Sequence, residues 1–307
     1  MPNGTHNALE DPRNEEVFIS INGELFPRKE AKISVFDSGY LVGDGVWEGL
    51  RLHHGVLVFW DDHMDRLWQG AKAIGMDLGM TRNDLRKQVQ NVIDANEMSD
   101  GVHVRIMITR GIKKTPSQDP RLTISGPNVV TIAEHKKADP GTRNKGIILF
   151  TSTIRRGSPD YLDPRLNCHS KLHEVQALIQ ALEAGADEAL MLDVNGFVST
   201  CNATNFFMVK DGEVWTSTGQ YCMNGITRGK VIEVCEENNI PCHQKNFSLF
   251  DVYGAEEAFV TGSFGGLTPV TKIDGREISK SVPGTITGLL QKLYEGAIEA
   301  DVERQKI

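Results

Sequence analysis

The chain has 307 residues, which is long enough to bury a substantial core and to form two domains. Acidic residues outnumber basic ones by 41 to 33, and the net charge of −8 with dispersed Lys and Arg argues against nucleic acid as a main partner. No apolar run approaches membrane-spanning length and the first residues are polar, so we expect neither a membrane anchor nor a signal peptide.

The first half of the chain predicts hairpins, then helices and further strands. Asn22-Gly23 and His54-Gly55 each lie between two strand-like segments, a pattern typical of short hairpins. Asp61-Asp62 is the expected cap of a helix with an apolar stripe. The predicted strands are 18–21, 24–26, 49–53, 56–60, 102–109 and 129–133, and the predicted helices are 63–74 and 81–95.

Residues 136–145 are rich in Lys, Pro, Gly and Asn and are the predicted linker between two domains. We therefore expect a loose lead-in over 1–15, a smaller N-terminal α+β domain over 16–135 and a larger C-terminal α+β domain over 146–307. The second domain predicts strands at 146–153, 188–192, 197–199, 206–210, 214–216, 242–247 and 258–261, and helices at 173–184, 230–238 and 284–296. This irregular alternation with many hairpins favours the α+β class over a doubly wound parallel sheet.

The cysteine content points to a reducing compartment. Five cysteines are an odd number, and their spacing shows no pairs. This favours free thiols in a cytoplasmic protein over a disulfide framework or a zinc site. We expect no metal centre. The five are Cys168, Cys201, Cys222, Cys235 and Cys242.

Two turns of small residues predict a phosphate site. The first is Gly225-Ile226-Thr227-Arg228, which runs into a helical pattern, and the second is Thr261-Gly262-Ser263. A helix N-terminus with a Thr hydroxyl is a ready anion site, and a Gly-Ser turn can close over the same phosphate. Plain helix capping is the alternative for these hydroxyls, and the two roles can coexist.

Six segments taken in order resemble the fold-type IV pyridoxal-phosphate-dependent enzymes, which include branched-chain aminotransferases, D-amino acid aminotransferases and aminodeoxychorismate lyases. The segments are 39–48, 63–67, 185–190, 202–206, 225–228 and 268–270, and they span nearly the whole chain. The resemblance implies a two-domain α+β fold with pyridoxal 5'-phosphate in the cleft between the domains and a homodimer that completes the pocket. It also implies transfer of an amino group between a small or branched-chain amino acid and a 2-keto acid.

The resemblance also assigns residues to the cofactor. Arg66 is expected to hold the phosphate with a charge-assisted bond, and a solvated helix arginine is the alternative. Thr200 is expected to face the cofactor ring. The residues expected to contact the phosphate from the two turns are Gly225, Ile226, Thr227, Gly262 and Ser263.

The resemblance gives a second set of residues for the substrate pocket. Tyr40 and Trp47 resemble aromatic residues that line it, with ordinary core packing as the alternative, and Phe264 is expected beside them. Arg105 and Arg110 are at positions that bind a substrate carboxylate in one branch of the family or another. Five residues apart, they point to opposite sides of an ideal strand, so at least one is expected to be a surface or interface charge.

The chain departs from the family at two chemical groups. The family's Schiff-base lysine lies eighteen or nineteen residues before the glycine at position 185, where this chain has Asn167 and Leu166. The family's glutamate at the pyridine nitrogen is replaced by Thr200. A carboxylate there keeps the ring nitrogen protonated and makes the ring a strong electron sink, which a threonine cannot do.

Lys171 and His169 are the candidate catalytic residues near the missing lysine. Lys171 continues the apolar stripe of Val175, Leu178 and Leu182, which would partly desolvate its amine and favour the neutral, nucleophilic form. Alternatively, its long stem carries the ammonium to water. His169 could serve as a general base near neutral pH, or it could be a loop histidine bonded to the backbone.

Three functions remain open from the sequence. The first is amino transfer with Lys171 as the proton carrier. The second is a divergent family member that binds the cofactor or another phosphorylated ligand non-covalently, with a different activity or none. The third is a lyase of the aminodeoxychorismate type.

Overall fold

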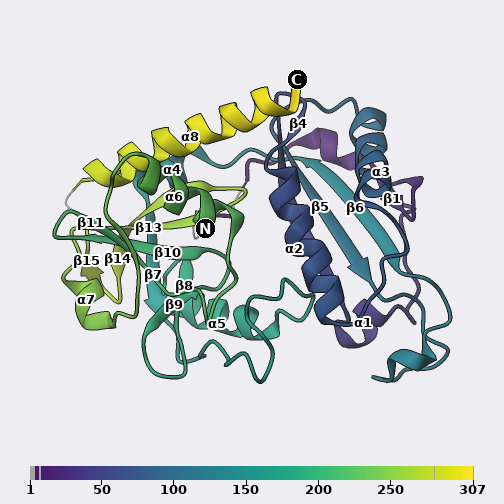
Figure 1. Cartoon of the computed structure of the whole chain (residues 1–307), viewed down its shortest axis with the longest axis horizontal. Helices are drawn as coiled ribbons and strands as arrows, with labels where there is room; N and C mark the ends of the chain where they lie inside the picture. The colour runs from purple at the N-terminus through teal and green to yellow at the C-terminus, as the bar shows by residue number, and fades with distance from the viewer. Residues whose placement is uncertain (1–3, 7, 280, 307) are drawn as a thin grey trace. The chain divides into compact units, whose positions relative to one another are not determined.

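The computed structural model describes residues 4–6, 8–279 and 281–306, and it divides into two compact units (Figure 1). The N-terminal unit consists of Glu10–Lys137, Leu166–Lys171 and the residues from Val302 onward. The C-terminal unit consists of the residues up to Leu9, Ala138–Arg165 and Leu172–Asp301. Each unit combines helices with one sheet, so the prediction of the α+β class is confirmed.

The N-terminal unit is built on a six-stranded antiparallel sheet with the order β2-β1-β6-β5-β3-β4. Asn22 and Gly23 both have positive φ in the first hairpin, which the shortest turns require. Its strands are β1 Phe18–Ile21, β2 Glu24–Pro27, β3 Gly45–His53, β4 Val56–Leu57, β5 Val102–Thr109 and β6 Asn128–His135. Its helices are α1 Ser38–Val42, α2 Trp60–Ala73 and α3 Arg82–Ala95, with short 3₁₀ helices at Pro12–Glu15 and Pro120–Leu122.

The core of the N-terminal unit lies where α2 and α3 cover this sheet. β5 alternates as predicted, because Val102, Val104, Ile106 and Ile108 are buried and the residues at 103, 105 and 107 are only partly covered. Helix α2 buries the stripe that contains Met64 and Leu67 against them. The sheet and α2 therefore form a rigid support for polar groups placed on β3 and α2.

The C-terminal unit is built on a nine-stranded mixed sheet with the order β12-β11-β10-β13-β14-β7-β8-β9, and β15 pairs with β14. Three of its pairings, β11 with β12, β14 with β7 and β7 with β8, are parallel. Its strands are β7 Ile147–Thr151, β8 Glu188–Leu192, β9 Val198–Cys201, β10 Asn205–Lys210, β11 Glu213–Thr216, β12 Cys242–Gln244, β13 Glu257–Gly262, β14 Gly266–Ile273 and β15 Arg276–Glu277. The helices after the first unit are α4 Pro140–Lys145, α5 Leu172–Glu183, α6 Ile226–Glu237, α7 Leu249–Tyr253 and α8 Thr285–Lys306.

One predicted helix start and the predicted linker differ from the structure. Helix α2 begins at Trp60 after Phe59, which has φ 54° and makes no side-chain cap, so Asp61-Asp62 lies inside the first turn and is not the cap. A short helix, α4, forms within the predicted linker because the Asp139 side chain accepts a hydrogen bond from Gly141 N at 2.8 Å. Asp-Pro-Gly is a helix start here rather than a break.

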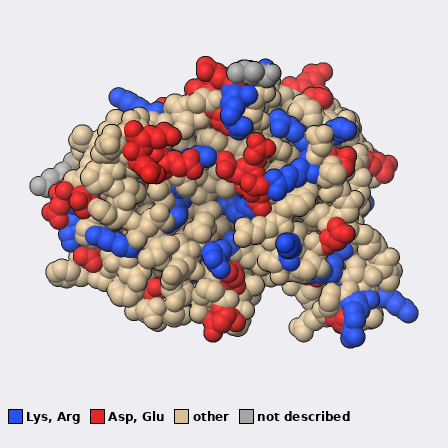
Figure 2. Space-filling model, viewed as in Figure 1, with Lys and Arg blue, Asp and Glu red and all other residues tan. Residues whose placement is uncertain are grey.

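Charge and hydropathy give no sign of a specialised surface. On the face drawn in Figure 2, basic and acidic side chains are interspersed. Within the described part of the chain, none of the helices combines the length and apolar character needed to cross a bilayer.

Candidate active site

The N-terminus of α6 in the C-terminal unit presents the first predicted anion turn. Gly225 is the N-cap, and no side chain caps the helix. A Cβ at Gly225 would lie 2.3 Å from Asn205 Oδ1, so only glycine fits against this amide. Thr227 is buried in the first turn, and its hydroxyl lies 3.2 Å from Tyr294 Oη. The first-turn N–H groups of α6 are therefore available to an anion, since no cap occupies them.

The second predicted turn lies at the β13–β14 connection of the same unit. β13 ends at Gly262 and β14 begins at Gly266, so Ser263 lies in the tight turn between them. Thr261 is the cross-strand partner of Asn205, and its Oγ1 is buried without a hydrogen-bond partner. Because Gly225 also borders Asn205, the two turns lie on either side of one side chain, as the phosphate prediction requires.

Asn205 also ties Thr200 to this centre. Its Nδ2 donates to Thr200 Oγ1 at 3.3 Å and to the Met223 carbonyl at 2.9 Å, and Thr200 Oγ1 donates to the Thr204 carbonyl at 2.8 Å. The sequence predicted that Asn205 holds a turn. It gave no signal that this residue also organises both phosphate turns, because its contacts with them are distant along the chain.

Residues 4–6 pack against the second turn. The Thr5 carbonyl lies 3.3 Å from the place a Cβ on Gly265 would take, and the His6 ring stacks on Phe264 with 6.4 Å between centroids. Thr5 is buried, with its hydroxyl and N–H both bonded to Glu188 Oε1. Part of the expected lead-in is therefore attached beside the predicted phosphate turn, where its His6 ring covers Phe264.

In the N-terminal unit, Arg66 is held by a buried carboxylate. Its Nε and Nη2 donate to the two oxygens of Glu48, each at 2.7 Å, and His63 Nδ1 donates to Glu48 Oε2 at 2.7 Å. Burial would raise the pKa of Glu48, but the charge and hydrogen bonds of Arg66 and the contact with His63 outweigh it and lower that pKa to about 2. Arg66 is therefore a fixed, partly buried cation and not a solvated helix residue.

Arg105 and Arg110 have separate environments. The Arg105 guanidinium lies 4.2 Å from the centroid of the Trp47 ring, and its burial lowers its pKa while Glu134 opposes the shift. Arg110 uses Nε and Nη2 on Asp44, at 2.6 and 3.0 Å, and donates to the Ile74 and Gly75 carbonyls at the end of α2. Arg110 therefore fastens α2, and Arg105 is the better placed to meet an anionic ligand.

The loop 166–171 lies along the first residues of β3 like an added strand. Trp47 N donates to the Asn167 carbonyl at 3.1 Å, and Asn167 Nδ2 donates back to the Trp47 carbonyl at 2.6 Å. His169 N donates to the Gly45 carbonyl at 3.0 Å, and Trp47 Nε1 donates to the Cys168 carbonyl at 3.1 Å. The residue at the family's lysine position is thus fixed by its backbone and by its side chain.

His169 has the backbone-bonded arrangement that the sequence left open. Its Nε2 donates to the Val46 carbonyl at 3.1 Å, so the neutral ring carries its proton on Nε2. Burial lowers the pKa of His169, and the hydrogen bond to Val46 and the charge of Asp37 only partly oppose this. Nδ1 lies 3.2 Å from the place a Cβ on Gly39 would take, so this nitrogen keeps an unprotonated lone pair near neutral pH.

The predicted desolvation of Lys171 by the apolar stripe of α5 is not seen. Lys171 immediately precedes α5 and is partly buried. The helix buries Glu174, Ala177 and Ala181, whereas Val175 is 50% exposed and Leu182 is 42% exposed. The stripe that continues from Lys171 is therefore mainly on the exposed side, because the small alanines and not the larger residues face the sheet.

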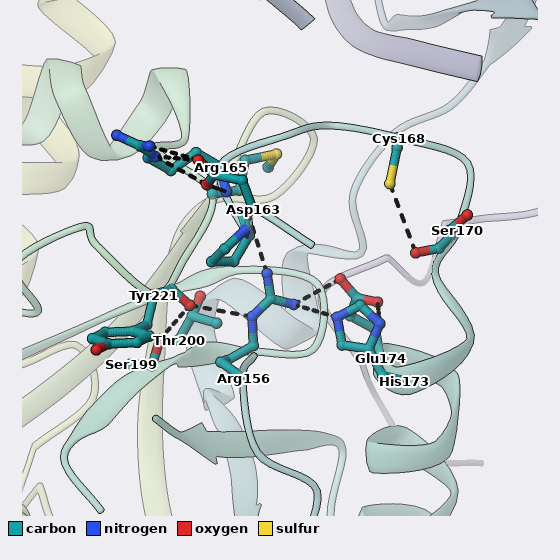
Figure 3. A network of polar contacts seen from close by, with 12 residues as sticks. Arg156, Asp163, Arg165, Cys168, Ser170, His173, Glu174, Ser199, Thr200 and Tyr221 are labelled. Atoms are coloured by element: carbon teal, nitrogen blue, oxygen red, sulfur yellow. Dashed lines mark hydrogen bonds and ion pairs between the residues drawn. The ribbon is translucent and has the colours of Figure 1, made fainter. Parts of the chain in front are cut away.

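The segment before α5 is anchored by Arg156 (Figure 3). This buried side chain donates from Nη1 to Glu174 Oε1 at 2.7 Å and to His173 Nε2 at 3.1 Å. Its Nε and Nη2 donate to the carbonyls of Tyr221 and Pro164, both at 3.3 Å. The Tyr221 carbonyl also accepts from Ser199 Oγ at 2.8 Å, so Arg156 connects α5 to the strand that carries Thr200.

Comparison with known proteins identifies the family. The model of the amino-transferase class IV family matches residues 45–273. The chain is 36% identical over 278 residues to a putative branched-chain-amino-acid aminotransferase of Methanocaldococcus jannaschii, covering 90% of this chain and 95% of the relative. The chain belongs to the class IV aminotransferases.

Plant relatives of this class IV aminotransferase are longer. The branched-chain-amino-acid aminotransferase-like protein 2 of Arabidopsis thaliana is 39% identical over 289 residues, which are 94% of this chain but 51% of the plant protein. The like protein 1 of the same plant matches to a similar extent. The chain thus spans about half the length of these curated relatives.

Solved structures agree with the family. A bacterial-type match, the T.th. branched-chain amino acid aminotransferase with pyridoxamine 5'-phosphate, has a TM-score of 0.86 and 26% identity, covering 92% of this chain and 95% of the other. A second structure of that enzyme, with N-(5'-phosphopyridoxyl)-L-glutamate, has a TM-score of 0.84 and covers 93% of this chain and 95% of the other. Class IV aminotransferases use pyridoxal phosphate, so the predictions of family, fold and cofactor are confirmed.

The residues of this class IV chain fit one end of the cofactor better than the other. An uncapped helix N-terminus, the buried Thr227 and the unpartnered Thr261 hydroxyl suit a phosphate. At the family's lysine position, Asn167 has no amine, and its Nδ2 is engaged by Trp47. The phosphate end therefore fits, and the covalent attachment of the aldehyde at this position does not.

Proposed function

We propose that this chain is a pyridoxal-phosphate-dependent aminotransferase that moves an amino group between a small or branched-chain amino acid and a 2-keto acid. The observation that supports it best is the meeting of the α6 N-terminus, Thr261 and Thr200 at one side chain, Asn205, in a class IV chain. The branched-chain names of the relatives support the substrate class.

The phosphate would be held by the groups that the sequence predicted. In the C-terminal unit, the N–H groups of Ile226 and Thr227 with the Thr227 hydroxyl would bind it, and Gly262 and Ser263 would close the second side. In the N-terminal unit, Arg66 would add the positive charge, because Glu48 holds its guanidinium in a single orientation. Gly225 permits the close approach of Asn205 that brings these turns together.

The substrate carboxylate would be bound by Arg105. This half-buried cation is stacked on Trp47, and the cost of burying its positive charge is relieved by an anion. Tyr40, which is 72% exposed, and Phe264 would contact the substrate side chain. Arg110 would contribute only by fastening α2, since Asp44 and two carbonyls bind its guanidinium.

Proton movement would fall to Lys171 and His169. When bound, pyridoxal phosphate supplies the electron sink for the bond changes at the substrate carbon. Lys171 Nζ would carry the proton, and the His169 Nδ1 lone pair would accept one. Thr200 cannot supply the negative charge of the family's glutamate, so a slower reaction than in the lysine-containing relatives is expected.

A homodimer and a cytoplasmic location are the further expectations for this function. Val35 and Tyr40 are among the exposed apolar residues around α1, and a second copy would cover them. The five thiols are free, which suits a reducing compartment.

A purified sample tests the proposal with branched-chain amino acids and 2-oxoglutarate. We expect amino transfer that needs added pyridoxal phosphate, and Arg105→Leu should raise KM about tenfold or more because a charge-assisted bond is lost. Lys171→Met should lower kcat. Phosphate-ligand binding without any amino transfer would instead support the second candidate, a non-covalent binding protein, which the Asn167 substitution favours. Pyruvate release without a keto acid would point to a lyase.

A further inference from the structure

Asn167 leaves one buried hydrogen-bond acceptor unused. The residue is only 4% exposed, and its Oδ1 has no hydrogen-bond partner. A buried amide oxygen without a partner costs about 1–3 kcal/mol, so such groups occur mainly where a water or a ligand completes them. This atom therefore indicates a missing hydrogen-bond donor in the N-terminal unit.

The assignment of oxygen and nitrogen in this amide is fixed by its neighbour. The 2.6 Å contact is with the Trp47 carbonyl, which can only accept, so the NH₂ group must face it and the oxygen must face away. The backbone carbonyl of Asn167 is also used, because it accepts from Trp47 N at 3.1 Å. The side chain cannot turn to satisfy its own oxygen without breaking this pair of bonds.

The unused oxygen lies near the groups proposed for the phosphate ligand. The residue after Trp47 on β3 is Glu48, which binds Arg66 on α2. Leu166, the residue before Asn167, approaches α2 one turn after Arg66, since its Cδ1 is 3.3 Å from the place a Cβ on Gly70 would take. Asn167 is therefore packed into the same strand and helix that hold the proposed phosphate arginine.

We infer that Asn167 selects the amine form of the cofactor, pyridoxamine 5'-phosphate, over the aldehyde form, and holds it without a covalent bond. This inference rests on the proposed function for its phosphate site. A protonated primary amine on the ligand would donate to Asn167 Oδ1, which a charged donor makes a strong bond. The aldehyde oxygen has only lone pairs to offer the same atom, so it gains nothing there. A side chain that condenses with the aldehyde in the relatives is replaced by one that accepts from the amine.

Three ligands that differ at a single substituent test this on the unchanged protein. Pyridoxamine 5'-phosphate, pyridoxal 5'-phosphate and 4'-deoxypyridoxine 5'-phosphate share the ring and phosphate and carry an amine, an aldehyde and a methyl group. By calorimetric titration we expect the amine to bind at least about tenfold more tightly than the methyl compound, and the aldehyde to bind no more tightly than it. Equal affinity of the amine and methyl compounds would overturn the inference, as would tighter binding of the aldehyde.

Two variants separate this inference from the proposed function. Asn167→Leu should bring the amine compound to the affinity of the methyl compound, and unchanged binding of the methyl compound shows that the loop is still folded. Arg66→Gln should weaken all three ligands by the same factor. Weak or absent binding of all three to the unchanged protein would count against the proposed function, whereas three equal affinities that all fall in Arg66→Gln would refute the selectivity alone.

A gain-of-function variant checks the position of Asn167 directly. Asn167→Lys restores an amine at the place where the relatives have one. We expect borohydride treatment with pyridoxal 5'-phosphate to label residue 167 in this variant, detected by peptide mass spectrometry, and to leave residue 167 of the unchanged protein unlabelled. A folded Asn167→Lys protein that binds the methyl compound but is never labelled at residue 167 would show that this side chain does not face the ligand, which would refute the inference.

Discussion

The two units contain the same trio of buried side chains used for different purposes. In the N-terminal unit, Glu48 accepts from Arg66 and His63. In the C-terminal unit, Glu174 accepts from Arg156 at 2.7 Å, and His173 Nδ1 lies 2.9 Å from its second oxygen. Both carboxylates are buried, and each histidine lies on a helix of its own unit, α2 or α5.

The difference between the trios lies in where the arginine directs its donors. Arg156 divides its donors among a carboxylate, an imidazole and two backbone carbonyls, all of which belong to the protein's own packing. Arg66 makes a two-bond fork with one carboxylate, which sets the orientation of its guanidinium. A buried arginine with a glutamate is therefore no functional signature by itself; the geometry of its remaining partners decides.

Removing the carboxylate of the first trio should give the largest loss of stability. Glu48→Ala leaves Arg66 and His63 in the core without their acceptor, and breaking a buried pair in this way costs about 3–5 kcal/mol. Three of the four tryptophans lie in the N-terminal unit, so its urea unfolding can be followed by fluorescence. Asp65→Ala is the matched control on α2, because Asp65 and Arg82 form an exposed pair worth at most about 1 kcal/mol. Equal losses in the two variants would contradict the assignment.

The same carboxylate should make the N-terminal unit sensitive to acid. The pKa of Glu48 is about 2 in the folded protein, below its ordinary value of 4.5, so ionised Glu48 stabilises the folded state above about pH 4.5. This contribution, on the order of 3 kcal/mol, is lost as the pH falls through about 2. The difference in unfolding free energy between the unchanged protein and Glu48→Gln should therefore be constant above pH 5 and should shrink toward pH 2. A difference that does not change with pH would show that the charge of Glu48 is not what stabilises the unit.

Removing the arginine of the second trio should cost somewhat less. Arg156→Met should destabilise the C-terminal unit by about 2–3 kcal/mol, below the usual range for a broken buried pair, because His173 still faces Glu174 and water can reach its edge. Limited proteolysis should cut between residues 154 and 165 faster, since the Pro164 and Tyr221 carbonyls lose their donor. Arg165→Ala is the control, since its pair with Asp163 is exposed and its loss should leave the cleavage rate unchanged.

The sequence predicted the features that depend on neighbouring residues. The Asn22-Gly23 hairpin, the full length of β5 and the start of α3 near Thr81 follow from local patterns and are confirmed. The first turn of α2 was placed wrongly, because its N-cap is Phe59 in a left-handed conformation and no capping side chain marks it. The exposed stripe of α5 was also misjudged, since periodicity shows that a stripe exists but not which side of the helix the sheet covers.

The candidate site shows the same limit more sharply. Arg66 and the turns at Gly225 and Ser263 can be found from motifs, and their assignment to phosphate remains a prediction. The contacts of Asn167 with Trp47 and of Arg110 with Asp44 join residues that are far apart in the chain. No local pattern encodes such contacts, so the sequence could not separate Arg105 from Arg110 or show that Asn167 keeps an unused oxygen.

A third buried carboxylate gives the smallest expected effect and sharpens the comparison of charged and uncharged partners. Glu188 is buried in the C-terminal unit and accepts from the hydroxyls of Thr5 and Thr204. Thr5→Val keeps the shape of the side chain but removes one hydroxyl donor, so we expect a loss of about 1–2 kcal/mol, less than in either trio. Thr204→Val and the double variant complete a thermodynamic cycle in urea unfolding. Because both hydroxyls serve one carboxylate, the double variant should lose more than the sum of the single losses, and strict additivity would show that Glu188 does not depend on the two threonines jointly.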